Sequence, residues 1–132
     1  MSLYVDTSAL LKLYVEEAES DACEAFLARD DDWVTAAHTL VEVRRNLSRL
    51  LTDEALADAS AQFNDDWAGI RVIELDLRLC EAAALIAERT GARSLDALHL
   101  AAAVVTGHPR LVTYDARLAA AAEELGIQST AP

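Results

Sequence analysis

The sequence predicts an α/β protein, a three-layer α/β/α sandwich with a short central parallel sheet. Short apolar runs alternate with longer segments in which apolar residues recur every three or four positions, as expected of strands joined by crossover helices. The first run, Leu3 to Val5, is continuously apolar, as in strands covered on both faces. The chain has 132 residues, of which 53% are apolar, so we expect one domain, residues 1–132, with one core.

The first half of the chain predicts two strands and four helices. The first strand is Leu3 to Val5, and Asp6 ends it. Thr7 or Ser8 is expected to cap a helix whose apolar positions extend to Tyr14. The further elements of this half are helices over residues 16–32, 38–51 and 52–70 and a strand over residues 33–36. The last two helices follow one another directly, which predicts an α-hairpin inserted between strands.

The second half predicts three strands and three helices. Strands are expected over residues 72–75, 111–113 and 127–129, and a helix over residues 115–125. A further helix runs between Asp76 as its N-cap and Gly91 as its C-cap. Another begins at Ser94 and continues to residue 105, where Gly107 and Pro109 close it. The crossover connections should be right-handed.

The composition excludes several classes of protein. A formal net charge of −12 argues against a general polyanion binder, so any role with nucleic acid must work through a local site. We find no signal peptide pattern and no apolar run long enough to span a bilayer, and we expect a soluble, cytoplasmic protein. Cys23 and Cys80 are isolated from one another and are expected to be reduced thiols in or near the core.

Two acidic residues follow predicted strands. Asp6 comes directly after the first strand, and Asp115 lies just past the strand over residues 111–113. Thr113, two residues before Asp115, should point to the same side if the strand stays extended. Ligands bind at the carboxyl ends of strands in open α/β sheets, so these acids are well placed to hold a metal. Asp6 alone could equally be a turn or capping residue.

Two further acids lie on predicted helices. Asp96 falls in the first turn of the helix that begins at Ser94, where interaction with the helix dipole is an alternative role. Glu42 lies on the helix over residues 38–51, where an exposed salt bridge to Arg45 is the alternative. Three histidines complete the candidates. His99 is expected to be a hydrogen-bonded packing residue, and His38 and His108 have no companion that indicates a role.

Four acids in one crevice would indicate a metal site. Asp6, Glu42, Asp96 and Asp115 converge only if the sheet is wound as predicted. Carboxylates gathered in one cleft repel one another, and a hard divalent cation such as Mg²⁺ or Mn²⁺ removes that cost. Two such ions can stabilise the attacking and leaving oxygens of a phosphodiester displacement. A metal would also supply the positive charge that so acidic a chain would need in order to bind RNA.

The sequence resembles the PIN-domain family, and more closely the VapC-type toxin ribonucleases. The matching segments are YVDTSALLKLY at the N-terminus, LVEVRRNL around Glu42, SLDALHLAAA around Asp96 and LVTYDARLAAAAEELGI around Asp115. The resemblance implies a metal-dependent endoribonuclease whose acidic ligands are Asp6, Glu42, Asp96 and Asp115. It also implies that Thr113 supports or orients water at the site and that Thr7 and Ser8 lie near it. Many members carry a further acid after the last aspartate, whereas Ala116, Arg117 and Leu118 stand here, which leaves a second metal open.

The resemblance also implies partners. A cognate antitoxin with a basic segment is expected, together with a homodimer of the chain. The helical faces of residues 18–28 and 41–67 are candidate surfaces for an antitoxin helix, and the equal alternative is that the protein's own core and dimer contact fill them. The acidic cleft would receive an arginine or lysine of the antitoxin. The alternatives are a solitary PIN nuclease without antitoxin and a catalytically silent PIN-like binding module.

A phosphoryl-transfer domain is the alternative from another class, since such domains also place a reactive aspartate after a parallel strand. A haloacid-dehalogenase-like phosphatase would need a second aspartate two residues after Asp6, where Ser8 stands. A response-regulator receiver would need a lysine near the end of a late strand, and none lies near Thr113 or Ser129. The sequence leaves open which RNA is cut and at which position.

Overall fold

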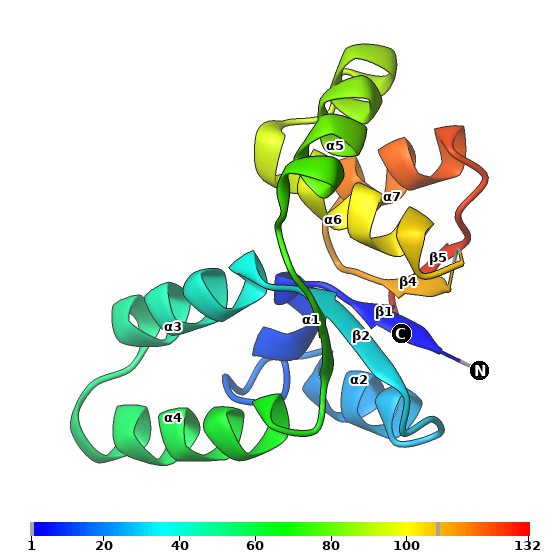
Figure 1. Cartoon of the computed structure of the whole chain (residues 1–132). Helices are drawn as coiled ribbons and strands as arrows, with labels where there is room; N and C mark the ends of the chain where they lie inside the picture. The colour runs from blue at the N-terminus through cyan, green and yellow to red at the C-terminus, as the bar shows by residue number, and fades with distance from the viewer. Residues whose placement is uncertain (1, 108) are drawn as a thin grey trace.

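The computed structural model describes residues 2–107 and 109–132 and confirms the α/β sandwich (Figure 1). The elements in chain order are β1 (Leu3–Val5), α1 (Thr7–Leu11), α2 (Ser20–Leu27), β2 (Trp33–Ala36), α3 (His38–Leu50), α4 (Asp53–Trp67), β3 (Arg71–Ile73), α5 (Leu77–Thr90), α6 (Ser94–Val105), β4 (Arg110–Val112), α7 (Ala116–Glu124) and β5 (Ser129–Thr130). His108 lies outside the described residues.

The five strands form one parallel sheet in the order β3-β2-β1-β4-β5. β1 is central, with Leu3 opposite Trp33 of β2 and Arg110 of β4. The chain moves outward from β1 through β2 to β3, and then crosses back to β4 on the other side of β1. The strand order therefore reverses between β1 and β4, and in open α/β sheets ligands bind at the carboxyl edge of such a reversal.

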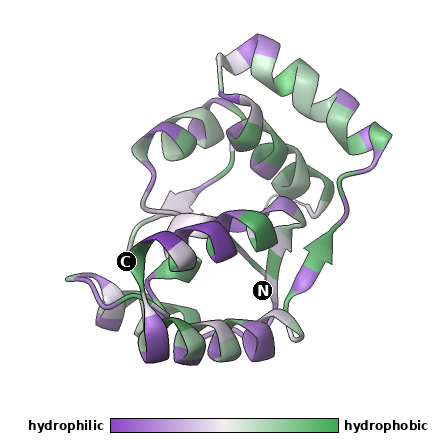
Figure 2. Ribbon diagram, turned by 90° about the vertical axis from the view of Figure 1, so that its left-hand side faces the viewer, coloured by the Kyte–Doolittle hydropathy of each residue, from purple (hydrophilic) through white to green (hydrophobic). Residues whose placement is uncertain are grey.

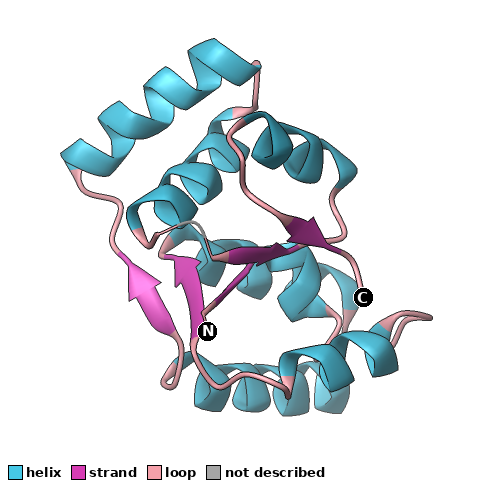
Figure 3. Cartoon of the chain, turned by 90° about the vertical axis from the view of Figure 1, so that its right-hand side faces the viewer, coloured by secondary structure: helices cyan, strands magenta, loops and turns pink. Residues whose placement is uncertain are grey.

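Two helical layers cover the sheet, α1 to α4 on one face and α5 to α7 on the other (Figures 1 and 3). Successive residues of β1 serve opposite layers: Leu3 and Val5 pack with α1 to α4, and Tyr4 packs with α5 to α7. This double burial explains why β1 is continuously apolar. The helices carry hydrophobic and hydrophilic residues along the same ribbon, as expected of helices packed on a sheet (Figure 2).

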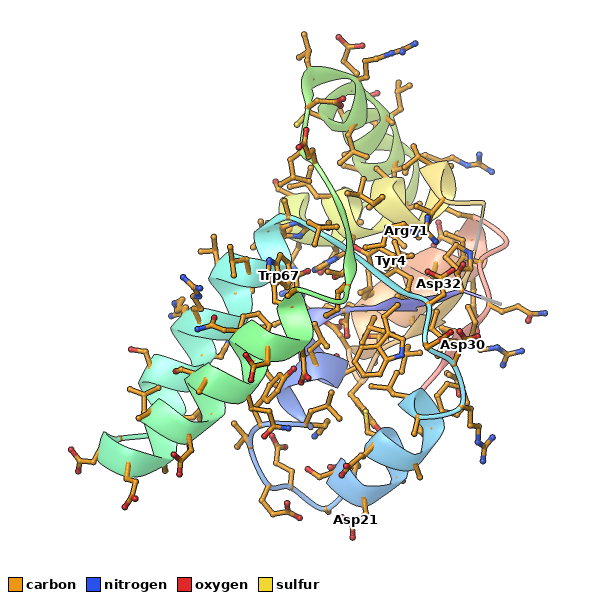
Figure 4. All side chains as sticks on the ribbon, turned by 60° about the horizontal axis from the view of Figure 1, so that its bottom comes forward. Tyr4, Asp21, Asp30, Asp32, Trp67 and Arg71 are labelled. Carbon is orange, nitrogen blue, oxygen red and sulfur yellow. The ribbon has the colours of Figure 1, made fainter. Side chains whose placement is uncertain are left out.

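An ion pair closes the amino edge of the sheet, away from the reversal. Arg71 at the start of β3 and Asp32 just before β2 lie 3.2 Å apart, and Figure 4 shows them side by side. The hydroxyl of Ser2 also donates to Asp32. Both charged side chains are about half-exposed, so we assign this pair little stabilising energy.

The helix expected over residues 16–32 is shorter, because α2 occupies only Ser20–Leu27. Side chains hold the preceding segment in a turn: Ser20 Oγ accepts a hydrogen bond from the N–H of Glu17, and Lys12 pairs with Glu17 and Glu19. At the other end, the indole of Trp33 donates to the Asp30 carbonyl (2.7 Å) and thus binds the chain as it enters β2.

The last strand is Ser129–Thr130 rather than residues 127–129. The N–H of Ile127 donates to the Ala122 carbonyl (2.9 Å), so Ile127 closes the turn after α7 instead of pairing with β4. The other predicted boundaries differ from the observed ones by three residues or fewer, and Asp76 and Gly91 cap α5 as predicted.

The prediction for the cysteines is confirmed for one and wrong for the other. Cys23 is buried and its thiol lies 3.5 Å from the Ala9 carbonyl, whereas Cys80 is exposed. Leu79 next to Cys80 faces the core, and one residue turns an α-helix by about 100°, which carries Cys80 to the outside.

None of the helices in residues 2–107 and 109–132 combines the length and the apolar character that a membrane span requires.

Candidate active site

Asp6 is buried at the carboxyl end of β1, with 3% of its surface exposed. Its Oδ1 accepts hydrogen bonds from the Ala9 N–H (3.0 Å) and the Ser8 hydroxyl (2.8 Å). Asp6 is therefore the N-cap of α1, and the expectation that Thr7 or Ser8 caps this helix is wrong. The other oxygen, Oδ2, accepts a hydrogen bond from the Thr113 hydroxyl (2.7 Å). Asp6 thus combines the capping role with a place at the reversal of the sheet.

Thr113 joins the ends of β1 and β4. Its hydroxyl donates to Asp6 and accepts a hydrogen bond from the backbone N–H of Asp115 (3.0 Å). Ser8 reinforces the junction, because its hydroxyl oxygen accepts from the N–H of Tyr114 (2.9 Å). Asp115 follows β4 and caps α7 through its Oδ1. Asp115 and Thr113 therefore lie at the carboxyl edge of the sheet beside Asp6, as predicted.

Glu42 reaches the same region from α3. Its Oε1 accepts a hydrogen bond from the Thr7 hydroxyl (2.8 Å) and lies 3.0 Å from Nε2 of His99. Among the described residues Arg45 makes no salt bridge with Glu42, so that alternative is wrong. Burial raises the pKa of Glu42, but hydrogen bonding to His99 and Thr7 outweighs it, and the pKa lies below its ordinary value. Glu42 is an ionised acceptor in this network.

His99 lies between Glu42 and Tyr4. Its Nδ1 lies 2.7 Å from the Tyr4 hydroxyl, and the two rings meet edge to face at 82°. The expectation of a hydrogen-bonded packing residue is confirmed. His38 lies against the same imidazole with 4.1 Å between ring centroids, and its Nε2 lies 3.2 Å from the Leu95 carbonyl.

Sequence reasoning missed Tyr4 and His38 as neighbours of the site. Tyr4 was interpreted only as an apolar strand residue, although a buried tyrosine hydroxyl needs a hydrogen-bond partner. His38 lies four residues before Glu42, and that spacing places both side chains on one face of α3. The buried tyrosine in the first strand and the four-residue spacing of His38 and Glu42 were therefore the signals by which the sequence could have indicated these two neighbours.

Arg93 connects the two remaining acids. Its Nε donates to Oδ2 of Asp96 (3.2 Å), and its Nη2 lies 3.5 Å from Oδ2 of Asp115. Asp96 lies in the first turn of α6, as predicted, and its side chain is 13% exposed. Sequence reasoning did not single out Arg93, although its position three residues before Asp96 was a signal for an ion pair. A cation of the chain itself therefore lies between two of the predicted acids.

Contacts and short stretches of backbone link all four acids into one network at the reversal of the sheet. On one side the members are Asp6, Thr113, Asp115, Arg93 and Asp96, and on the other they are Thr7, Glu42 and His99. Within the described residues, the group of possible metal-ligating atoms that lie mutually within 4.8 Å is His38, Glu42 and His99. The three predicted aspartates are not in that group.

The chemistry of the donors fits a divalent cation. Carboxylate oxygens are the ligands that Mg²⁺ prefers, and imidazole nitrogens suit transition metals. Burial raises the pKa of Asp6, against the opposing effects of His99, Thr113 and Ser8. A positive charge beside Asp6 would therefore favour its ionised form. The arrangement can bind a cation and, through it, an anionic substrate.

Comparison with known proteins identifies relatives over nearly the whole chain. The family model described as the PIN domain matches residues 3–124. Ribonuclease VapC35 of Mycobacterium tuberculosis is 38% identical, covering 98% of this chain and 96% of the relative. Ribonuclease VapC49 of the same species is 34% identical over 94% of this chain and 91% of the relative.

Solved structures share the fold at lower sequence identity. VapC20 of Mycobacterium tuberculosis, described as a toxin that cleaves the sarcin-ricin loop, superposes with a TM-score of 0.75 at 23% identity, covering 90% of this chain and 94% of that one. FitAcB from Neisseria gonorrhoeae gives a TM-score of 0.80 at 18% identity, covering 98% and 97%. A toxin–antitoxin complex from Klebsiella pneumoniae gives 0.71 at 18% identity, covering 91% of each chain.

Proposed function

The chain belongs to the PIN-domain family, among the VapC ribonucleases, and from this premise we propose that it is a metal-dependent endoribonuclease and the toxin of a type II toxin–antitoxin pair. The observation that carries the proposal is the network at the sheet reversal, which connects Asp6, Glu42, Asp96 and Asp115. The family assignment leaves the phosphoryl-transfer alternatives without support. We treat residues 1–132 as one PIN domain that acts on RNA in the cytoplasm.

Each acid has a role in the proposal. Asp6 and Asp115 would be the central ligands of Mg²⁺ or Mn²⁺, and Glu42 and Asp96 would complete or position the coordination. The ion would supply a Lewis acid that makes water a stronger nucleophile and offsets the charge of the phosphodiester. The Thr113 hydroxyl donates to Asp6 and accepts from the Asp115 N–H, so we assign it to positioning these two acids.

Exposed apolar side chains on the surface support the proposed contacts with an antitoxin and with a second copy of the chain. Val41 and Leu50 on α3 expose 67% and 46% of their surface, and each offers an apolar side chain to a protein contact on its own side of the helix. We propose that the helices within residues 18–28 and 41–67 contribute to the antitoxin or homodimer contact. A basic segment of the antitoxin would pair with the carboxylates and compete with the cation.

RNA cleavage by matched variants tests the function. Wild-type protein and Asp6→Asn are compared on single-stranded RNA with Mg²⁺, with Mn²⁺ and in excess chelator. We expect cleavage only by the wild type with metal, and a folded Asp6→Asn protein, because asparagine also caps helices well. Asp21→Asn, an exposed change on α2 (Figure 4), should keep full activity. Full cleavage by Asp6→Asn or in chelator would contradict the mechanism, and an inactive wild type would favour the silent binding module.

A further inference from the structure

A cavity of about 370 Å³ opens beside the acids, between the α5–α6 turn and α7. Its lining includes Gly91, Arg93, Asp96, Arg117 and Glu124. Its volume falls within the range of about 300–1,000 Å³ that is usual for small-ligand sites. Because Asp96 belongs both to this lining and to the candidate active site, whatever fills the cavity lies next to the reacting region.

We propose that this cavity is a subsite of the ribonuclease, in which Arg93 and Arg117 bind a phosphate of the RNA next to the one that is cleaved. The inference rests on the proposed function and adds the path of the substrate. A chain with a net charge of −12 repels RNA at long range, so the affinity must come from local cations. Two guanidinium groups beside the acids provide them.

Arg93 can contact Asp96, Asp115 and a phosphate at the same time. Its guanidinium uses Nε toward Asp96 and Nη2 toward Asp115, which leaves Nη1 and its two N–H donors for a further acceptor. The side chain is 60% exposed and therefore accessible to RNA. Gly91, with φ +73°, ends α5 in the left-handed conformation and fixes the short turn that carries Arg93.

Arg117 supplies the second cation from α7. It lies two residues after Asp115, and its backbone N–H donates to the Asp115 carboxylate (2.9 Å). Its guanidinium has no hydrogen bond or ion pair with any residue in the described part of the chain. A guanidinium is weakly hydrated and matches phosphate oxygens in a two-pronged geometry, so an unpaired arginine in this position suits an RNA phosphate.

Binding of a labelled single-stranded oligoribonucleotide tests the subsite. Affinity is measured in chelator or in the Asp6→Asn background, so that the result does not depend on cleavage. We expect Arg93→Gln and Arg117→Gln each to weaken binding roughly three- to tenfold, and the slope of log K against log salt to fall by about 0.7 for each lost contact. In the cleavage assay Arg117→Gln should raise KM with kcat retained, and Arg117→Lys should restore part of the loss.

Arg78→Gln is the matched control, because Arg78 is exposed and lines a different cavity, beside β3 and α5. RNA affinity and salt slope that are the same in Arg93→Gln, Arg117→Gln and Arg78→Gln would overturn the subsite. The subsite would also be overturned if Arg93→Gln and Arg117→Gln bound RNA normally and lost only the binding of a protein partner. The same holds if Arg93→Gln changed the affinity for metal while both arginine variants bound RNA normally. A protein that binds RNA through these arginines but never cleaves it would instead contradict the proposed function and leave the subsite supported.

Discussion

The hydroxyl of Tyr4, in the middle of the central strand, lies 2.7 Å from Nδ1 of His99, and Nε2 of the same ring lies 3.0 Å from Glu42. Tyr4 has no exposed surface and His99 exposes only 4%. The imidazole therefore cannot turn without leaving buried polar groups unpaired, which is costly. A residue inside the sheet thus sets the orientation of an acid at its edge.

Tyr4→Phe should lower cleavage activity about tenfold, the low end of what is usual for residues that orient metal ligands. The ring and its packing remain, and only the hydroxyl is lost. The free energy of unfolding should fall by about 0.5–1.5 kcal/mol. Tyr14→Phe is the control, because the Tyr14 hydroxyl donates to Asp66 (2.7 Å) away from the acids, and it should cost similar stability with no loss of activity. Equal activity loss in both variants would show that the effect is one of stability alone.

Thr113→Val should reduce kcat strongly and destabilise the protein by about 1–3 kcal/mol. The substitution keeps the shape of the side chain but leaves Asp6 Oδ2 without its donor and the Asp115 N–H without its acceptor. Thr113→Ser keeps the hydroxyl and should recover most of the activity. Thr106→Val removes a hydroxyl whose partners, among the residues that the structure describes, are carbonyls of α6, and it should leave kcat unchanged. Kinetics and thermal melts of the variants check this, and an active Thr113→Val protein would contradict the positioning role.

The stability of the protein should decrease as pH falls from about 6.5 toward 4 because of His38. Burial, followed by the charge of His99, lowers the pKa of His38 to about 4. Between these pH values the unfolded chain binds more protons at this residue than the folded chain does, so acid favours unfolding. Denaturant titrations at pH 7 and pH 5 should show a smaller change for His38→Gln than for the wild type. An unchanged pH dependence in that variant would rule out His38 as the cause.

Most of the fold could be predicted because the pattern of apolar residues along the sequence agrees with the residues that the structure buries. The continuous apolar run of β1 indicated a strand covered on both faces, and both layers are present. The helix over residues 16–32 was overestimated because glutamate and alanine at positions 16–19 suit a helix well, whereas Lys12 and Ser20 hold that segment in a turn. Side-chain hydrogen bonds between a loop and its neighbours leave no periodic signal in the sequence.

Only those parts of the site that follow from the position of a residue at the end of a strand could be predicted. Asp6, Asp115 and Thr113 follow strands, so their common edge could be inferred from topology. The bridge from Arg93 to Asp115 joins residues far apart in sequence, and its formation depends on how α6 and α7 pack. The burial of Tyr4 against His99 likewise depends on the packing of α6 on β1.

The last prediction concerns the antitoxin. If a basic segment of the antitoxin enters the cleft, its affinity should fall as salt rises, because exposed charges are screened over about 10 Å at 0.1 M salt. Asp96→Lys should weaken capture further, since it places a positive charge beside Arg93. Glu81→Lys makes a matching charge reversal at an exposed position on α5, outside the helices proposed for the antitoxin contact, and should bind as the wild type does. The measurement is co-purification with the protein encoded beside this gene, followed by an RNA-cleavage assay of the complex. A neighbour that binds and leaves cleavage intact would contradict inhibition through the cleft, and the absence of a binding neighbour would favour a solitary PIN nuclease.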